Sequence, residues 1–323
     1  MEIGSFIELG LIKDREYYKG ENVAKLNNGR AGIYHSMRVL GCNTIHLPYY
    51  LCDTVRDFLI KRGMTVKYYY IDSKLNPIDL NIINDEAVLF VNYFGVMSKE
   101  RMKSLSNGYK NVIIDNSQAF FANLLDNCLN VYSVRKFVGV PDGCYVVGEN
   151  ATKYLDEYKQ DYSSDTSLFL LQRIEKGCEA SYQSRMLNEE RVDNSDILKM
   201  SKLTHAILDS IDYSTIKTKR IENYAIAKEM FDSINKLKIS QYYADDCVPM
   251  VYPLLVESDE LLPYMQKNKI FQGHWWSYLL DEVSNSTFEY YISRYIIPIT
   301  IDQRYGREEL AFTKKTIEDK LNK

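Results

Sequence analysis

The amino-acid sequence predicts an α/β fold with two parts: a large domain around a mostly parallel sheet and a small C-terminal α+β domain. Short, almost continuously apolar runs alternate with amphipathic helical stretches over the first 150 residues, which is typical of parallel strands covered by helices. After residue 150 the pattern changes to long polar helical stretches. The 323 residues and the 46% hydrophobic content suffice for two domains with a buried core.

The first half of the chain supplies the elements of the sheet. A helix is expected at residues 30–40, directly after the polar stretch 27–29. Strands are expected at 43–50, 65–71, 87–94, 111–115, 129–133 and 144–148, and helices at 51–63 and 98–108.

The second half is predominantly helical at first and mixed near its end. Helical stretches are expected at 152–177, 195–213 and 217–237. They are followed by strands at 251–256, 270–276 and 296–301 and by helices at 259–268 and 307–323. We place the domain boundary near residues 211–216, which gives a large domain at 1–212 and a small domain at 213–323.

Composition and targeting signals exclude several classes of protein. Forty basic residues against 44 acidic residues leave a net charge of -4, so no general positive field would attract nucleic acid. The first ten residues lack a basic region and contain two glutamates, and the longest apolar stretch is too short to span a bilayer. The six cysteines are scattered without metal-ligand spacing. We therefore expect a reduced, cytoplasmic protein without membrane insertion and without a metal site.

Polar residues follow the predicted strands at the points where each strand ends. Ligands of open parallel sheets bind beyond these carboxyl ends. The residues at these positions are Gly29 and Arg30 at the first helix, Tyr50, Asn92, Asp115 with Gln118, and Ser133 with Lys136.

A lysine, a carboxylate and a helix N-terminus on one rim match the needs of a pyridoxal phosphate (PLP) site. Lys136 offers an amine for a Schiff base, and Asp115 offers a negative charge to the ring nitrogen. Backbone N–H groups at the start of a helix bind phosphate, and glycine allows close approach. The phosphate donors are expected to be Gly29, Arg30 and Ala31, with the hydroxyl of Ser133 in addition.

Each of these residues taken alone also has an ordinary structural explanation. An aspartate after a strand is commonly a cap or turn residue, and a single lysine is usually a solvated charge. A glycine after two asparagines is compatible with a simple turn. The order and spacing of the set favour a PLP site, but the residue pattern leaves both interpretations open.

Several segments resemble the DegT-type PLP-dependent sugar aminotransferases, in a divergent branch. The resemblance covers most of the chain, and the combination of IIDNSQAFF, SVRKF and PDG is its most specific part. The segments are NNGRAG, LPYYLC, VNYFGV, IIDNSQAFF, VYSVRKFVGVPDGC, VPMVYPLLV, GHWW and SRYIIPITIDQRYGREEL.

The resemblance implies fold type I, a homodimer with shared active sites, and a role for each matched residue. Lys136 is implied as the Schiff-base lysine and general acid–base, Asp115 as the partner of the pyridine nitrogen, and Gln118 as the partner of the phenolic oxygen. Residues 29–31 and Ser133 are implied to hold the phosphate. Tyr50 is the candidate for packing on the ring, although family members often carry an aromatic residue near the position of Cys52.

The substrate side departs from the pattern of the family. A tyrosine–serine–valine–arginine block replaces the usual histidine-containing block before the lysine, and the asparagine-rich segment that reaches the neighbouring subunit is not recognisable. Asn92, Arg185 and His274 are the candidates for substrate binding, with Asn188 a possible further stand-in beside Arg185. His274 and the two tryptophans after it are equally compatible with packing against the large domain.

Retention of Lys136 favours transamination, because dehydratases of this superfamily carry histidine there. The expected reaction transfers an amino group, from L-glutamate through pyridoxamine phosphate, to a keto sugar linked to a nucleotide diphosphate, for surface polysaccharide or related sugar biosynthesis. Alternatives are amination of a smaller phosphorylated or unactivated ketone, and a catalytically silent homologue that acts as a scaffold dimer.

Overall fold

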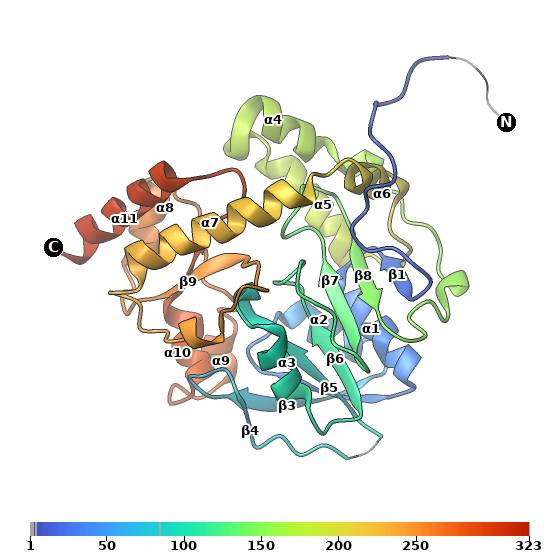
Figure 1. Ribbon diagram of the computed structural model, residues 1–323, viewed down its shortest axis with the longest axis horizontal. Helices are drawn as coiled ribbons and strands as arrows, with labels where there is room; N and C mark the ends of the chain where they lie inside the picture. Colours follow the sequence, from blue (N-terminus) through green and yellow to red (C-terminus); the bar gives the residue numbers. More distant parts are fainter. Residues whose placement is uncertain (1–2, 4, 84, 323) are drawn as a thin grey trace.

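An eight-stranded, mostly parallel sheet forms the centre of the computed structural model, which describes residues 3, 5–83 and 85–322 (Figure 1). Five adjacent strands run parallel, while β8 lies antiparallel between β1 and β7, and β4 pairs antiparallel with β3. The strands in spatial order are β1 (Val23–Leu26), β8 (Cys144–Val147), β7 (Leu129–Ser133), β6 (Asn111–Asp115), β5 (Ala87–Val91), β2 (Thr44–Pro48), β3 (Thr65–Ile71) and β4 (Pro77–Ile78).

Helices pack on this sheet as the alternating pattern predicts. The strands β5, β7 and β8 are buried along their whole length, which explains their continuous apolar runs. Helix α1 (Gly29–Leu40) packs on β6, β7 and β8, and α3 (Lys99–Ser106) packs on β5. Helix α2 (Asp53–Ile60) contacts α1 and β3.

The helical stretches expected at 152–177 and 195–213 are wrong in their first halves. Residues 155–157 and 164–166 are short 3-10 turns, and helix begins only with α4 (Leu168–Ala180) in the first stretch and with α6 (Lys202–Asp209) in the second. Helix α5 (Tyr182–Asn194) lies between the two stretches, where no helix was expected. The backbones of residues 159–161 and 198–200 bond to each other and to the β1 region instead, as in Lys199 N–H to Lys159 O at 2.8 Å and Met200 N–H to Lys25 O at 3.1 Å. These tertiary hydrogen bonds override the local helical pattern.

The C-terminal part contains a two-stranded antiparallel sheet surrounded by helices. Strands β9 (Val251–Leu255) and β10 (Ile296–Thr300) pair along their whole length. The helices are α7 (Tyr213–Phe231), α8 (Leu261–Lys267), α9 (Leu279–Glu282), α10 (Phe288–Tyr295) and α11 (Arg307–Leu321). In Figure 1, α7 runs between the α4–α5 pair at one end and α8 and α11 at the other.

The strand expected at residues 270–276 is wrong, because this segment is a loop. It makes no ladder with β9 or β10, and Trp276 has a φ of 57°, which is incompatible with a strand. The rings of its two tryptophans, Trp275 and Trp276, pack on aromatic rings of the segments that follow β2 and β5 instead.

One hydrophobic core connects the two sheets. It contains Phe90 and Ile114 of the large sheet together with Leu254 and Ile297 of the small one. The boundary proposed from the sequence, between residues 212 and 213, coincides with the first residue of α7. Among the described residues, no helix combines the length and apolar character needed to cross a membrane.

Candidate functional site

The sheet topology places the predicted site residues along one edge. Strands β1, β2, β5, β6 and β7 all end at this edge, because they run in the same direction, and β8 begins there. The register pairs Asp115 with Val131 and Ser133 with Cys144, so the ends of β6 and β7 lie next to each other.

The start of α1 is surrounded by polar groups. Asn28 caps the helix, and its Oδ1 accepts the N–H of Ala31 at 2.9 Å. The N–H groups of Gly29 and Arg30 have no acceptor in the described chain. A Cβ on Gly29 would lie 3.3 Å from Ser117 Oγ and 3.9 Å from Ser133 Cβ, so these residues surround the same point.

This geometry changes the expected set of phosphate donors. The Ala31 amide is already used by the cap, so the expectation that it would hold phosphate is not supported by the structure. Ser117, which the sequence pattern did not single out, lies at the position where a third donor would be needed. Neither the Ser117 hydroxyl nor the Ser133 hydroxyl has a hydrogen-bond partner among the described residues. The position of Ser117 between Asp115 and Gln118 was the signal that could have identified it.

Asp115 is a buried carboxylate without a cation. It is 4% exposed, and its Oδ1 accepts the N–H of Ser117 at 2.8 Å. No donor reaches Oδ2, and no lysine, arginine or histidine of the described chain lies within ion-pair distance. Leaving a buried carboxylate unpaired is costly, so this environment suits a ligand that presents a positively charged N–H group.

Lys136 is exposed and makes no hydrogen bond or ion pair among the described residues. Its neighbours are anchored: Arg135 pairs with Glu189 at 2.5 Å, and the buried Phe137 lies under the guanidinium of Arg220 at 4.4 Å. The amine therefore belongs to a turn that is anchored on both sides, and it has no partner among the described residues.

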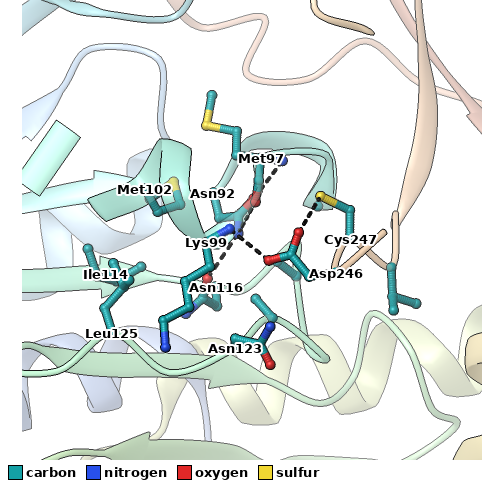
Figure 2. A pocket seen from close by; sticks show the side chains of 14 residues that line it. Asn92, Met97, Lys99, Met102, Ile114, Asn116, Asn123, Leu125, Asp246 and Cys247 are labelled. Atoms are coloured by element: carbon teal, nitrogen blue, oxygen red, sulfur yellow. Dashed lines mark hydrogen bonds between the residues drawn. The ribbon is translucent and has the colours of Figure 1, made fainter. Parts of the chain in front are cut away.

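Gln118 and Asn92 are both held by the loop that follows β5. Gln118 Oε1 accepts the N–H of Phe94 at 2.6 Å. Asn92 Nδ2 donates to Met97 O and to Asn116 Oδ1, both at 3.3 Å, and Asn92 Oδ1 accepts the Met97 N–H. Figure 2 shows Asn92 turned toward these partners. Its polar atoms are therefore engaged within the protein rather than directed toward a substrate.

The cavity beside Asn92 is too small for a substrate. It holds about 10 Å³, which is room for about one water molecule, and is lined by Met97, Met102, Ile114 and Cys247 among others (Figure 2). Burial raises the pKa of the Cys247 thiol to about 12, so this cysteine stays protonated at neutral pH.

Tyr50 lies in the core and not at a ligand surface. Its ring is 0% exposed and lies 5.5 Å from the ring of Tyr93 and 4.4 Å from that of Trp276. The expectation that Tyr50 packs on a cofactor ring is contradicted, because no face of its ring is accessible. Cys52, at the start of α2, is partly exposed and lies closer to the surface.

The remaining candidates, His274, Arg185 and Asn188, make contacts within the chain. His274 is half-buried, and its Nδ1 contacts Ile296 O at 2.8 Å. Arg185 on α5 is exposed and lies 3.5 Å from Glu189, the carboxylate that also binds Arg135 next to Lys136. Asn188 is fully buried and donates to Pro141 O at 2.8 Å, which anchors α5 on the Pro-Asp-Gly turn.

A larger cavity of about 520 Å³ lies between α2 and the end of α5. The Arg30 side chain is directed toward it, pairs with Asp193 at 2.9 Å and lies 5.4 Å from the Phe58 ring. The group of Arg30 that lies beside Gly29 is therefore its backbone N–H and not its guanidinium. The described residues contain no cluster of histidine, cysteine and carboxylate groups suited to a metal ion.

Comparisons with known proteins identify the fold. No protein-family model and no curated protein matches the sequence. Among solved structures, the sugar aminotransferase CalS13 from Micromonospora echinospora matches with a TM-score of 0.65 and 16% identity, over 92% of this chain and 87% of that one. A DegT DnrJ EryC1 StrS aminotransferase from Brucella abortus matches with a TM-score of 0.62 and 13% identity, over 94% of this chain and 87% of that one.

A dehydratase has the same fold. The GDP-4-keto-6-deoxy-D-mannose-3-dehydratase of E. coli, solved with bound hydrated PLP, matches with a TM-score of 0.61 and 12% identity, over 94% of this chain and 88% of that one. The chain therefore has the fold type I architecture of the DegT-type enzymes, which confirms the fold predicted from the sequence. Because enzymes of different chemistry share this fold, only the site residues can distinguish between the reactions.

Proposed function

We propose that this protein is a PLP-dependent aminotransferase that aminates a keto sugar. The observation that carries the proposal is that a buried, uncompensated carboxylate, Asp115, ends β6, while a free amine, Lys136, follows the end of the adjacent strand β7. The structural likeness to solved sugar aminotransferases supports the same reaction class.

The residues at the sheet edge fit this cofactor. PLP supplies an aldehyde and a ring that accepts electrons from the substrate. Lys136 Nζ would bind the aldehyde carbon, and Asp115 Oδ2 would accept the ring N–H. The N–H groups of Gly29 and Arg30, at the positive end of α1, would hold the phosphate together with the free hydroxyls of Ser117 and Ser133.

Lys136 also favours transamination over dehydration. A primary amine released from the cofactor can take a proton from the Cα atom of an amino acid and return one to the acceptor carbon, as general acid–base catalysis requires. L-Glutamate is the proposed donor, and a keto sugar linked to a nucleotide diphosphate is the proposed acceptor. The name of one structural neighbour, a dehydratase of a GDP-linked keto sugar, supports the acceptor class.

The proposed assembly is a homodimer in which the α4–α5 pair meets the second copy; α4 projects from the body in Figure 1. Large apolar side chains are exposed along this pair, and such patches mark interaction sites. They are Leu168, Leu171, Ile174, Tyr182, Met186 and Leu187. Contact through one self-complementary patch gives a closed, two-fold dimer.

Spectroscopy and turnover together test the proposed function. The purified protein should be yellow, and L-glutamate should bleach it. Lys136→Ala should lower amination of the keto sugar by about 10²- to 10⁴-fold, because proton transfer by a positioned base contributes that much. Lys202→Ala, an exposed lysine on α6, serves as the control and should retain turnover. Turnover near the wild-type level in Lys136→Ala would refute the assignment.

A further inference from the structure

Phe94 has a strained backbone at the edge of the site. It is fully buried with φ 61° and ψ -3°, a region that bulky residues rarely adopt. Gly95, the next residue, also has a positive φ, and a Cβ there would lie 2.5 Å from Gln118 O. The loop therefore runs in close contact with the segment that follows Asp115, and surrounding contacts must hold it there.

Three contacts hold Phe94 in this conformation. Its N–H donates to Gln118 Oε1 at 2.6 Å, and its carbonyl accepts the N–H of Met250 at 2.8 Å. Its ring stacks on Trp275, with centroids 5.3 Å apart and planes at 18°. Two of the three contacts come from the C-terminal part of the chain.

The contact with Phe94 also orients the amide of Gln118. A backbone N–H only donates, so the side-chain atom that meets it must be the oxygen, and the NH₂ group is the free end. Gln118 Nε2 has no acceptor among the described residues. The free end is therefore a donor that suits an oxygen anion of a ligand.

The loop that carries Trp275 is itself fixed. His274 contacts Ile296 O at the start of β10, and Trp276, with its positive φ, lies 4.4 Å from the ring of Tyr50. The two tryptophan rings are 5.7 Å apart. The contact of His274 with β10 therefore ties Trp275 to the small sheet.

We propose that Trp275 is a positioning residue for the cofactor. By stacking on Phe94 it maintains the strained peptide whose N–H fixes Gln118, and so it directs Gln118 Nε2 toward the phenolic oxygen of bound PLP. This inference rests on the proposed function for its ligand, while the link from Trp275 through Phe94 to Gln118 exists in the protein alone.

Hydrogen–deuterium exchange of the cofactor-free protein tests the link itself. Trp275→Ala should speed exchange of the Phe94 amide by about threefold to tenfold, which is the range for the loss of one aromatic pair. Trp275→Phe should restore slow exchange. Phe271→Ala, an exposed ring in the same loop, is the matched control. Unchanged exchange in Trp275→Ala, or an equal change in Phe271→Ala, would overturn the inference even if the protein binds no PLP.

The absorbance of the PLP-loaded protein tests the consequence. A donor to the phenolic oxygen stabilises the anion, so Gln118→Ala should raise the pH midpoint of the visible absorbance change. Trp275→Ala should also raise this pH midpoint. The double variant should have the same midpoint as Gln118→Ala alone. Additive shifts would show that Trp275 does not act through Gln118. A wild-type protein without PLP absorbance would refute the proposed function, and the exchange experiment would then decide the inference by itself.

Discussion

At the scale of single residues, two buried carboxylates, Asp161 and Asp115, differ in whether a cation lies beside them. Asp161 is buried, but Arg191 Nη1 lies 2.8 Å from both of its oxygens. Asp115 is equally buried and has no such partner. Because a buried charge without a partner destabilises a fold, the two carboxylates should respond in opposite ways to neutralisation.

Asp115→Asn should stabilise the cofactor-free protein by about 1–2 kcal/mol, since it removes an unpaired buried charge. The same change should weaken PLP binding by about 100-fold or more, because the ring nitrogen loses its counter-charge. Asp161→Asn, the control, should destabilise the protein without altering PLP affinity. Thermal unfolding and cofactor titration measure the two effects. A destabilised Asp115→Asn protein would mean that the Asp115 charge is compensated in the folded chain.

Glu16 gives a prediction for the pH dependence of stability. Burial alone would raise its pKa, but hydrogen bonds from His205, Lys25 and Tyr145 outweigh burial and lower the pKa to about 2. The ordinary value in the unfolded chain is 4.5. Glu16 therefore stabilises the fold above about pH 4.5, and this contribution is lost as the pH falls toward 2.

The contribution of Glu16 amounts to about 2–3 kcal/mol by linkage. Glu16→Gln should lower the free energy of unfolding by about this amount at pH 6, and the difference from wild type should shrink as the pH falls from 4.5 to 2. Denaturant unfolding across that range measures it. A difference that stays constant with pH would contradict the lowered pKa.

At the scale of elements, loops and helix starts carry the site, while strands only bring them together. The loop at residues 92–97 lies so close to the end of β6 that Gly95 has no room for a side chain. Gly108 also has a positive φ, of 88°, but no atom lies within 4 Å of its Cβ position. Substitutions at Gly95 and Gly108 therefore distinguish the cost of a left-handed backbone from the cost of a steric collision.

Gly108→Ala should cost about 1–2 kcal/mol of stability from its left-handed backbone alone. Gly95→Ala should cost more, because the new Cβ would collide with the carbonyl of Gln118, and it should also weaken PLP binding by moving Gln118. Chemical denaturation and cofactor titration compare the two variants. Equal stability losses with unchanged PLP affinity would show that the loop relaxes freely.

At the scale of the whole molecule, exposed apolar residues allow a test of the homodimer proposed above. Ile174 is 83% exposed on the α4–α5 pair, whereas Phe312 on α11 is a separate exposed ring at 54%. Ile174→Glu should shift the protein from dimer to monomer and lower activity, while Phe312→Glu should leave the dimer intact. Light scattering after size-exclusion chromatography measures both. A dimer unaffected by Ile174→Glu would place the interface elsewhere.

The strands and the edge they share follow from the sequence alone. Apolar runs and the residues that end them are local features, so β3, β6, β7 and β10 lie close to where the pattern places them. Asp115 and Ser133 end strands that the pattern already marks, and Lys136 follows one of them, so the sequence alone places these residues at the shared edge.

Only the tertiary structure decided how the site is lined. Tyr50 is buried because Trp276, more than 200 residues away in the sequence, packs against it. The Ala31 amide is bonded to the capping side chain of Asn28, and the Ser117 hydroxyl lies beside Gly29. Residues 159–161 and 198–200 leave the helical state because their backbones bond to each other and to the β1 region. Contacts between distant segments set all of these outcomes, and periodicity along the chain carries no information about such contacts.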